Sequence, residues 1–142
     1  MHDDVDLDLL TTTVLALEAS HQRLGWGVPA RLYGIGRAGT WAQLDEGPAY
    51  DIVERFTPLP GEALVAVALV CEGWCTPVGR AGGPHHGGRR QRLRTAVLVS
   101  RSGDQVAVLR RWGGEPTVVG EGHGALMDRL VHLGARLAAP VN

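Results

Sequence analysis

The side chains of this chain that could do chemistry gather in one connection, which runs from Cys71 to Thr95 and reads CEGWCTPVGRAGGPHHGGRRQRLRT. The connection joins two apolar runs and has no apolar period of its own. Connections longer than about 12–15 residues of this kind are uncommon in compact domains and tend to be functional or disordered. Thiols, imidazoles and guanidinium groups occur together here. Metal binding, thiol chemistry and phosphate binding are therefore the chemistries to weigh.

Cys71, Cys75, His85 and His86 are weak candidates for zinc ligands. Thiolate sulfur and imidazole nitrogen are the usual ligands of a tetrahedral zinc site. The spacing argues against such a site, because C-x₃-C in an extended segment is not a zinc knuckle and two adjacent histidines do not easily face one ion. We expect Cys71 to be a small buried apolar residue instead. We predict no metal and no cofactor.

An enzymatic role for the same residues lacks one component. Cys75 with His85 or His86 would pair a nucleophile with a base, but the sequence offers no third group to orient the imidazole. The chain also contains neither G-x-S-x-G nor H-E-x-x-H, the motifs of two large hydrolase classes. The sequence therefore favours a protein that is not an enzyme.

Arg89, Arg90, Arg92 and Arg94, with Arg80 nearby, form a basic cluster that suits contacts with phosphates. If this segment is extended, Arg90, Arg92 and Arg94 lie on one face of it. The cluster contains no aromatic residue on which a base could stack, and the isoelectric point near 6.6 is low for a nucleic-acid-binding domain. Nucleic-acid binding is therefore an alternative hypothesis.

A second glycine-rich segment, residues 120–124 (GEGHG), precedes the last expected helix. Free amides at a helix N-terminus can bind an anion, and an imidazole beside them could donate a proton. Gly122 and His123, approached by His85 or His86, define a further alternative, which is a small-ligand or catalytic site.

Charge is distributed unevenly along the chain. All 14 basic residues are arginine; residues 1–79 hold 4 of them against 11 acidic residues, and residues 80–142 hold 10 against 4. The net charge is only −1. Such a split suggests a bipolar surface, able to pair the two halves of one molecule or to bind an acidic partner. The simpler interpretation is that both sets of charges are solvated faces, since surface charges individually contribute little.

Length and composition predict a single globular domain over residues 1–142. Hydrophobic residues make up 44% of the chain and charged residues 20%, which is ordinary for a soluble protein. The acidic start MHDDVDLD is unlike a signal peptide, and the longest apolar run, 63–71, is far shorter than the ~20 residues that span a membrane. With two cysteines and no export signal, the expected location is the cytoplasm, without a membrane partner.

Hydrophobic periodicity indicates the elements that must position these residues. Apolar side chains recur at three-to-four spacing in 5–24 and 124–139, which predicts amphipathic helices. Strands are expected at 30–35, 64–71, 95–100, 105–112 and 117–119, and a short helix at 48–56. This order predicts an α+β domain. Its antiparallel four- to five-stranded sheet would be covered on one face by the N- and C-terminal helices, with a long Gly/His/Arg-rich connection at about 72–94 outside the sheet.

Several of these segments resemble, in the same order, a family of small uncharacterised actinobacterial proteins. They are GWGVPARLY at 25–33 after the first helix, the apolar strand 64–71, the His-then-Arg segment 85–94 leading into TAVLV, the SGD turn at 102–104, and the closing helix. The resemblance implies an α+β domain and carries no activity with it.

The leading functional hypothesis is a non-catalytic cytoplasmic binding domain. Its partner would be another protein or a second copy of the chain, because the charge split and an exposed sheet edge both suit association. Residues 80–94 are the expected contact surface.

Overall fold

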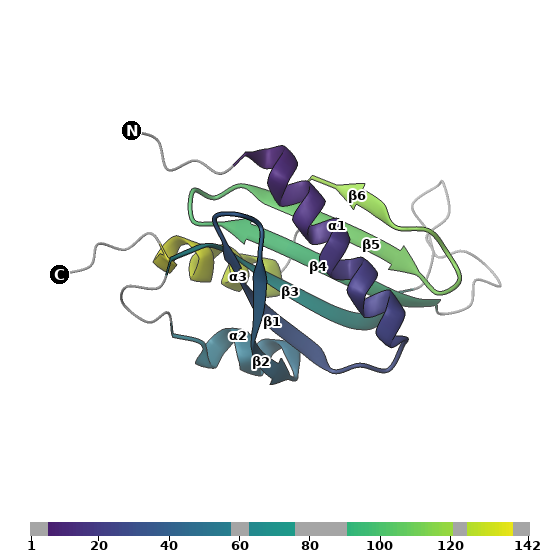
Figure 1. Cartoon of the computed structure of the whole chain (residues 1–142). Helices are drawn as coiled ribbons and strands as arrows, with labels where there is room; N and C mark the ends of the chain where they lie inside the picture. The colour runs from purple at the N-terminus through teal and green to yellow at the C-terminus, as the bar shows by residue number, and fades with distance from the viewer. Residues whose placement is uncertain (1–5, 58–62, 76–90, 121–124, 138–142) are drawn as a thin grey trace, which may run out of the picture.

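The computed structural model describes residues 6–57, 63–75, 91–120 and 125–137 (Figure 1). In these ranges the chain forms three helices and six strands. In chain order they are α1 (Leu7–Leu24), β1 (Ala30–Gly36), β2 (Trp41–Gly47), α2 (Ala49–Arg55), β3 (Leu64–Cys75), β4 (Gln91–Ser100), β5 (Gln105–Arg111), β6 (Thr117–Val119) and α3 (Ala125–Leu137).

The strands form one antiparallel sheet in the order β2-β1-β3-β4-β5-β6. The predicted α+β class is confirmed, whereas the predicted strand number was too low. The missed strand is β2, whose sequence WAQLDEG is polar and largely exposed at the sheet edge. Sequence periodicity detects burial, so an edge strand with little burial leaves a weak signal.

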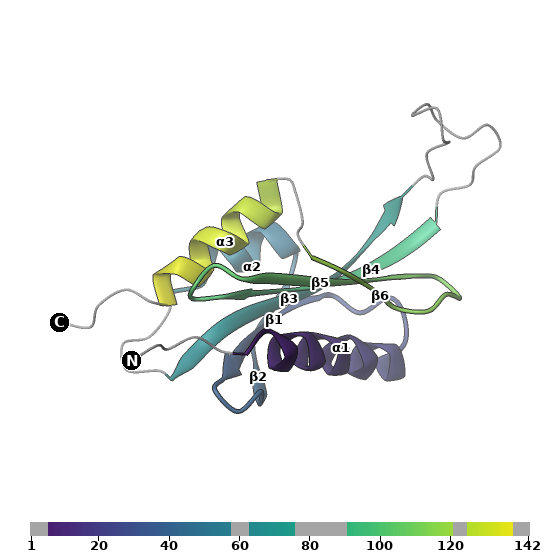
Figure 2. The same ribbon diagram turned by 90° about the horizontal axis from the view of Figure 1, so that it is seen from above.

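The helices cover both faces of the sheet, so the prediction that the N- and C-terminal helices share one face was wrong. Figure 2 shows α1 on one side of the sheet and α2 and α3 on the other. The physical reason is that β3 and β4 are apolar on both alternating faces, and each face must be covered. Leu10, Val14 and Leu17 of α1 pack in one core, and Leu130 and Leu133 of α3 in the other.

Local signals set the ends of α1. The side chain of Asp6 accepts a hydrogen bond from the amide of Asp8 at 3.0 Å, which is a helix N-cap. Gly25 follows the last turn with φ of 94°, a left-handed conformation that glycine adopts without strain. The helix therefore ends where the chain must turn towards β1.

Gly134 lets α3 approach β4 closely. A Cβ atom at this position would lie 2.9 Å from Cγ1 of Val99 and 3.2 Å from the carbonyl oxygen of Ser100. Alanine is the better helix former by about 1 kcal/mol, but here it would push the helix off the sheet. We expect Gly134→Ala to lower the free energy of unfolding by about 1–2 kcal/mol in urea denaturation. A gain in stability, as helix propensity alone predicts, would contradict this packing.

Candidate functional site

Only the last part of the predicted contact surface 80–94 belongs to the described residues. Arg80, His85, His86, Arg89 and Arg90 lie outside them, as do Gly122 and His123 of the second glycine-rich segment. The backbones of β3 and β4 pair as far as Cys75 and Gln91, so residues 72–75 and 91–94 belong to the sheet and the predicted connection at about 72–94 was too long. The connection between these strands therefore leaves and returns at one end of the sheet, where Arg92 and Arg94 lie.

Arg94 is an internal residue. Its side chain is fully buried under α1, where Nη1 donates to Glu18 Oε2 at 3.0 Å and to Gln22 Oε1 at 2.8 Å. Nη2 donates to the carbonyl oxygen of Gly25 at 2.9 Å. The expected role of Arg94 in a surface cluster is therefore wrong, because burial and these three hydrogen bonds remove the guanidinium from any external ligand.

Glu18 is the carboxylate that balances this buried charge. It is fully buried on α1 and also accepts two hydrogen bonds from Arg110 of β5, each 2.9 Å long. Burial alone would raise the pKa of Glu18, but hydrogen bonds from Arg110 and Arg94 outweigh it, so the pKa lies below its usual value. The same ion pair raises the pKa of Arg110. Both groups are therefore charged at neutral pH.

Glu72 of β3 fixes the loop between α1 and β1. Its carboxylate accepts hydrogen bonds from the amides of Gly27 at 2.9 Å and Val28 at 3.3 Å. It also accepts one from Nη2 of Arg92 at 2.9 Å. The loop belongs to the GWGVPARLY segment. The residues of this segment therefore have a structural role, because the loop presents its amides to Glu72 and carries Trp26.

Trp26, Arg92 and Trp112 form a compact cluster at this end of the sheet, which we call the aromatic end. The two indole rings lie 5.4 Å apart between centroids and are tilted by 45°. The guanidinium carbon of Arg92 lies 5.3 Å from the ring of Trp26 and 5.1 Å from that of Trp112. These distances are typical of cation–π contacts. Trp112 nevertheless keeps 58% of its surface exposed.

The buried ion network holds the aromatic end in place. The guanidinium carbon of Arg94 lies 4.3 Å from the ring of Trp26 on the buried side, and Glu72 links Arg92 to the loop that carries this tryptophan. Sequence reasoning found Arg92 as a candidate binding residue but did not find Trp26 or Trp112 as its neighbours. They come from other strands and loops, and no local spacing reports that they meet.

Ion pairs between the two halves of the chain account for part of the charge split. Acidic residues from the first half pair with arginines from the second: Glu18 with Arg94 and Arg110, Glu72 with Arg92, and Glu54 with Arg129. The charge split therefore reflects, in part, pairing within one molecule, and the simpler interpretation of two solvated faces does not hold for these residues.

Cys71 lies on the face of the sheet that α3 covers, opposite the face that carries Arg94, and it is half-buried. Burial raises the pKa of this thiol to about 11, and the nearby charge of Glu72 adds to the effect. The thiol is therefore protonated at neutral pH, whereas a reactive cysteine needs its thiolate. In the described part of the chain, no three His, Cys, Asp or Glu side chains gather closely enough to hold a metal ion.

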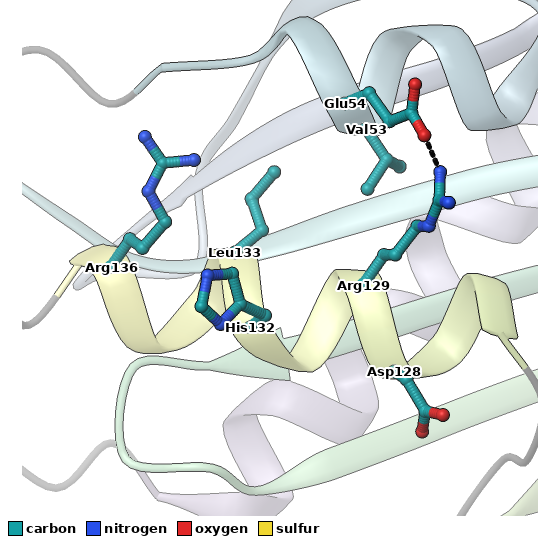
Figure 3. A pocket seen from close by; sticks show the side chains of 7 residues that line it. All are labelled: Val53, Glu54, Asp128, Arg129, His132, Leu133 and Arg136. Atoms are coloured by element: carbon teal, nitrogen blue, oxygen red, sulfur yellow. Dashed lines mark hydrogen bonds and ion pairs between the residues drawn. The ribbon is translucent and has the colours of Figure 1, made fainter.

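A shallow groove of about 390 Å³ lies between α2 and α3 (Figure 3). Arg129 and Glu54 point towards each other across it and form an ion pair, and Arg129 also lies 5.3 Å from the ring of Tyr50. Asp128 points away from this pair. Arg129 therefore already has a carboxylate partner within the molecule. The ion pair links α2 to α3, and the groove is a poor site for a charged ligand.

Comparison with protein-family models, with curated proteins and with solved structures finds no match to this chain. None of the helices in the described ranges is long and apolar enough to cross a membrane. The resemblance to the actinobacterial family therefore stays a prediction, and the geometry of the aromatic end carries the functional argument.

Proposed function

We propose that this protein is a non-catalytic cytoplasmic domain that binds another protein through the aromatic end. The observation that carries the proposal is the state of Trp112, which is 58% exposed yet is held against Trp26 and Arg92. Tryptophan and arginine are the residues most enriched at the energetic centres of protein interfaces. A side chain that is already ordered loses little entropy on binding.

The charges around the aromatic end favour a protein over a nucleic acid. Arg94 is buried against Glu18, and Arg92 shares Glu72 with the neighbouring loop. Two of the arginines that suggested phosphate binding therefore have carboxylate partners inside the molecule. Nucleic-acid binding remains the alternative proposal and depends on Arg80, Arg89 and Arg90. A small-ligand or catalytic site at Gly122 and His123 with His85 or His86 remains the other.

We expect Trp112→Ala to weaken partner binding at least tenfold, because truncating a central interface tryptophan commonly costs about 2 kcal/mol or more. Wild-type and variant proteins immobilised at equal density would be exposed to the soluble fraction of the source cells, and captured proteins quantified by mass spectrometry. Trp41→Ala is the matched control, since Trp41 is also exposed, at 39%, but lies on the edge strand β2. Equal loss in both variants, or none in Trp112→Ala, would refute the proposal.

The same variants decide whether the partner is a second copy of the chain. Sedimentation velocity at micromolar concentration would show a dimer for the wild type and Trp41→Ala, and a monomer for Trp112→Ala, if the aromatic end associates with itself. A wild type that stays monomeric assigns the surface to a different protein. Binding of labelled DNA or RNA that falls steeply with salt would support the nucleic-acid alternative instead.

A further inference from the structure

A cavity of about 390 Å³ lies between the sheet and the N-terminal half of α3, on the face opposite α1. We call it the α3 cavity. Leu69 and Cys71 of β3, Thr95 of β4 and Ala107 of β5 form its floor, and Met127 and Leu130 of α3 lie above them. It is distinct from the aromatic end, because Arg92 and Arg94 lie on the other face of the sheet.

The cavity lies where the sheet extends past the first turn of α3. Figure 2 shows the paired ends of β3 and β4 projecting beyond the first turn of α3. Where the helix begins, the strands present small or short side chains, namely Cys71, Thr95 and Ala107. These do not fill the space that a longer helix or larger side chains would occupy.

We infer that the α3 cavity binds a small uncharged apolar molecule of the medium-chain alkyl type. Among the described residues no charged side chain lines it, and eight of the ten described lining residues are apolar aliphatic residues or methionine. Its volume lies in the range of natural ligand pockets, roughly 300–1,000 Å³. An apolar cavity of about 150 Å³ already takes up benzene. The α3 cavity is therefore large enough for a longer chain.

The polar groups of the cavity lie together, and they orient the ligand. Cys71 and Thr95 are directly paired across β3 and β4, so their side chains are neighbours on one face. The Thr95 hydroxyl can donate or accept a hydrogen bond, and the Cys71 thiol is uncharged at neutral pH. A ligand with an alkyl chain and one hydroxyl or carbonyl group would place that group at this pair.

Burial favours a small molecule over the surface of a partner protein. All ten lining residues are buried or half-buried, so a flat protein surface cannot reach most of them. The cavity walls are provided by β3, β4, β5, β6 and α3. A ligand would therefore be enclosed by regular structure on several sides, as is usual for small-molecule pockets.

Primary alcohols from butanol to decanol are suitable probes, with isothermal titration calorimetry as the readout. We expect saturable binding, with affinity rising about fourfold for each added methylene until the cavity is full. Ala107→Leu should fill the cavity, keep or raise the melting temperature, and weaken octanol binding at least tenfold. Trp112→Ala, which alters the other face, should bind octanol like the wild type.

A second variant keeps the test decisive if Ala107→Leu does not fold. Thr95→Val preserves the shape of the side chain and removes its hydroxyl, so octanol should bind several-fold more weakly. Absence of saturable binding of every alcohol would overturn the inference, as would octanol affinity that neither variant changes. Either result leaves the proposed protein-binding role untouched, because that role is read from Trp112.

Discussion

Glu18→Gln is expected to lower the free energy of unfolding by about 3–5 kcal/mol at neutral pH, because it removes the closer of the two carboxylates that face a buried arginine and leaves only Glu72, at 3.9 Å. The guanidinium of Arg94 is fully buried and lies 3.0 Å from Glu18, so water cannot replace the lost carboxylate. Urea denaturation of wild type and variant measures the difference. The matched control is Glu46→Gln, which breaks the more exposed pair with Arg31. That change should cost less than about 1 kcal/mol.

The double variant Glu18→Gln, Arg94→Met separates the cost of an unpaired charge from the cost of lost packing. Removing both partners takes the uncompensated charge out of the core, so the double variant should be more stable than Glu18→Gln alone. Arg110, the other partner of Glu18, retains some exposure and can be solvated. If Glu18→Gln costs no more than Glu46→Gln, the buried network does not hold this end of the molecule together.

The stability of the protein is expected to fall by roughly 3 kcal/mol between pH 6.5 and pH 4 because of His21. This side chain is 2% exposed, and its Nε2 lies 2.7 Å from the hydroxyl oxygen of Tyr33. Burial first, and then the charges of Arg31 and Arg94, lower its pKa from 6.5 to about 4. In this window the unfolded chain binds a proton that the folded protein does not. Acidification therefore favours unfolding, and the stability is fully regained above pH 6.5.

Urea denaturation at half-unit pH steps tests this prediction. His21→Gln should remove most of the slope between pH 6.5 and pH 4.5, whatever its effect on stability at pH 7. His132→Gln, at an exposed position on α3, should leave the slope as it is. The loss from Glu18 comes at lower pH, since its lowered pKa keeps the carboxylate charged until the medium is more acidic. A wild-type stability that is flat from pH 7 to pH 4.5 would contradict the assignment.

Sequence reasoning succeeded where the signal is local. The helical period of α1, the apolar run of β3 and the turn before β5 can each be recognised from a few neighbouring residues. It failed for β2, which is polar at an edge, and for the placement of the helices. Two amphipathic helices and a sheet that is apolar on both faces permit either arrangement of α1 and α3 by pattern alone.

The candidate site shows the same division. Alternation along β4 correctly puts Arg92 and Arg94 on one face, but it cannot tell an exposed face from one covered by a helix. The residue that pairs with Arg94 inside the protein is Glu18, 76 residues away in sequence. From the sequence alone, a glutamate on a helix that is buried in an ion pair cannot be told from one that is exposed to solvent. The uneven charge of the two halves fits these long-range pairs, but it fits two solvated faces equally well and names no partner for any residue.

Footprinting of tryptophans by hydroxyl radicals is the measurement that tests the role of the aromatic end most directly. The protein would be oxidised alone and in the complex recovered with its captured partner, and modification at each tryptophan quantified by mass spectrometry. We predict that the partner protects Trp112 several-fold, while Trp41 on β2 is oxidised equally in both states. Protection of Trp41 without protection of Trp112, or no change at either, would contradict it.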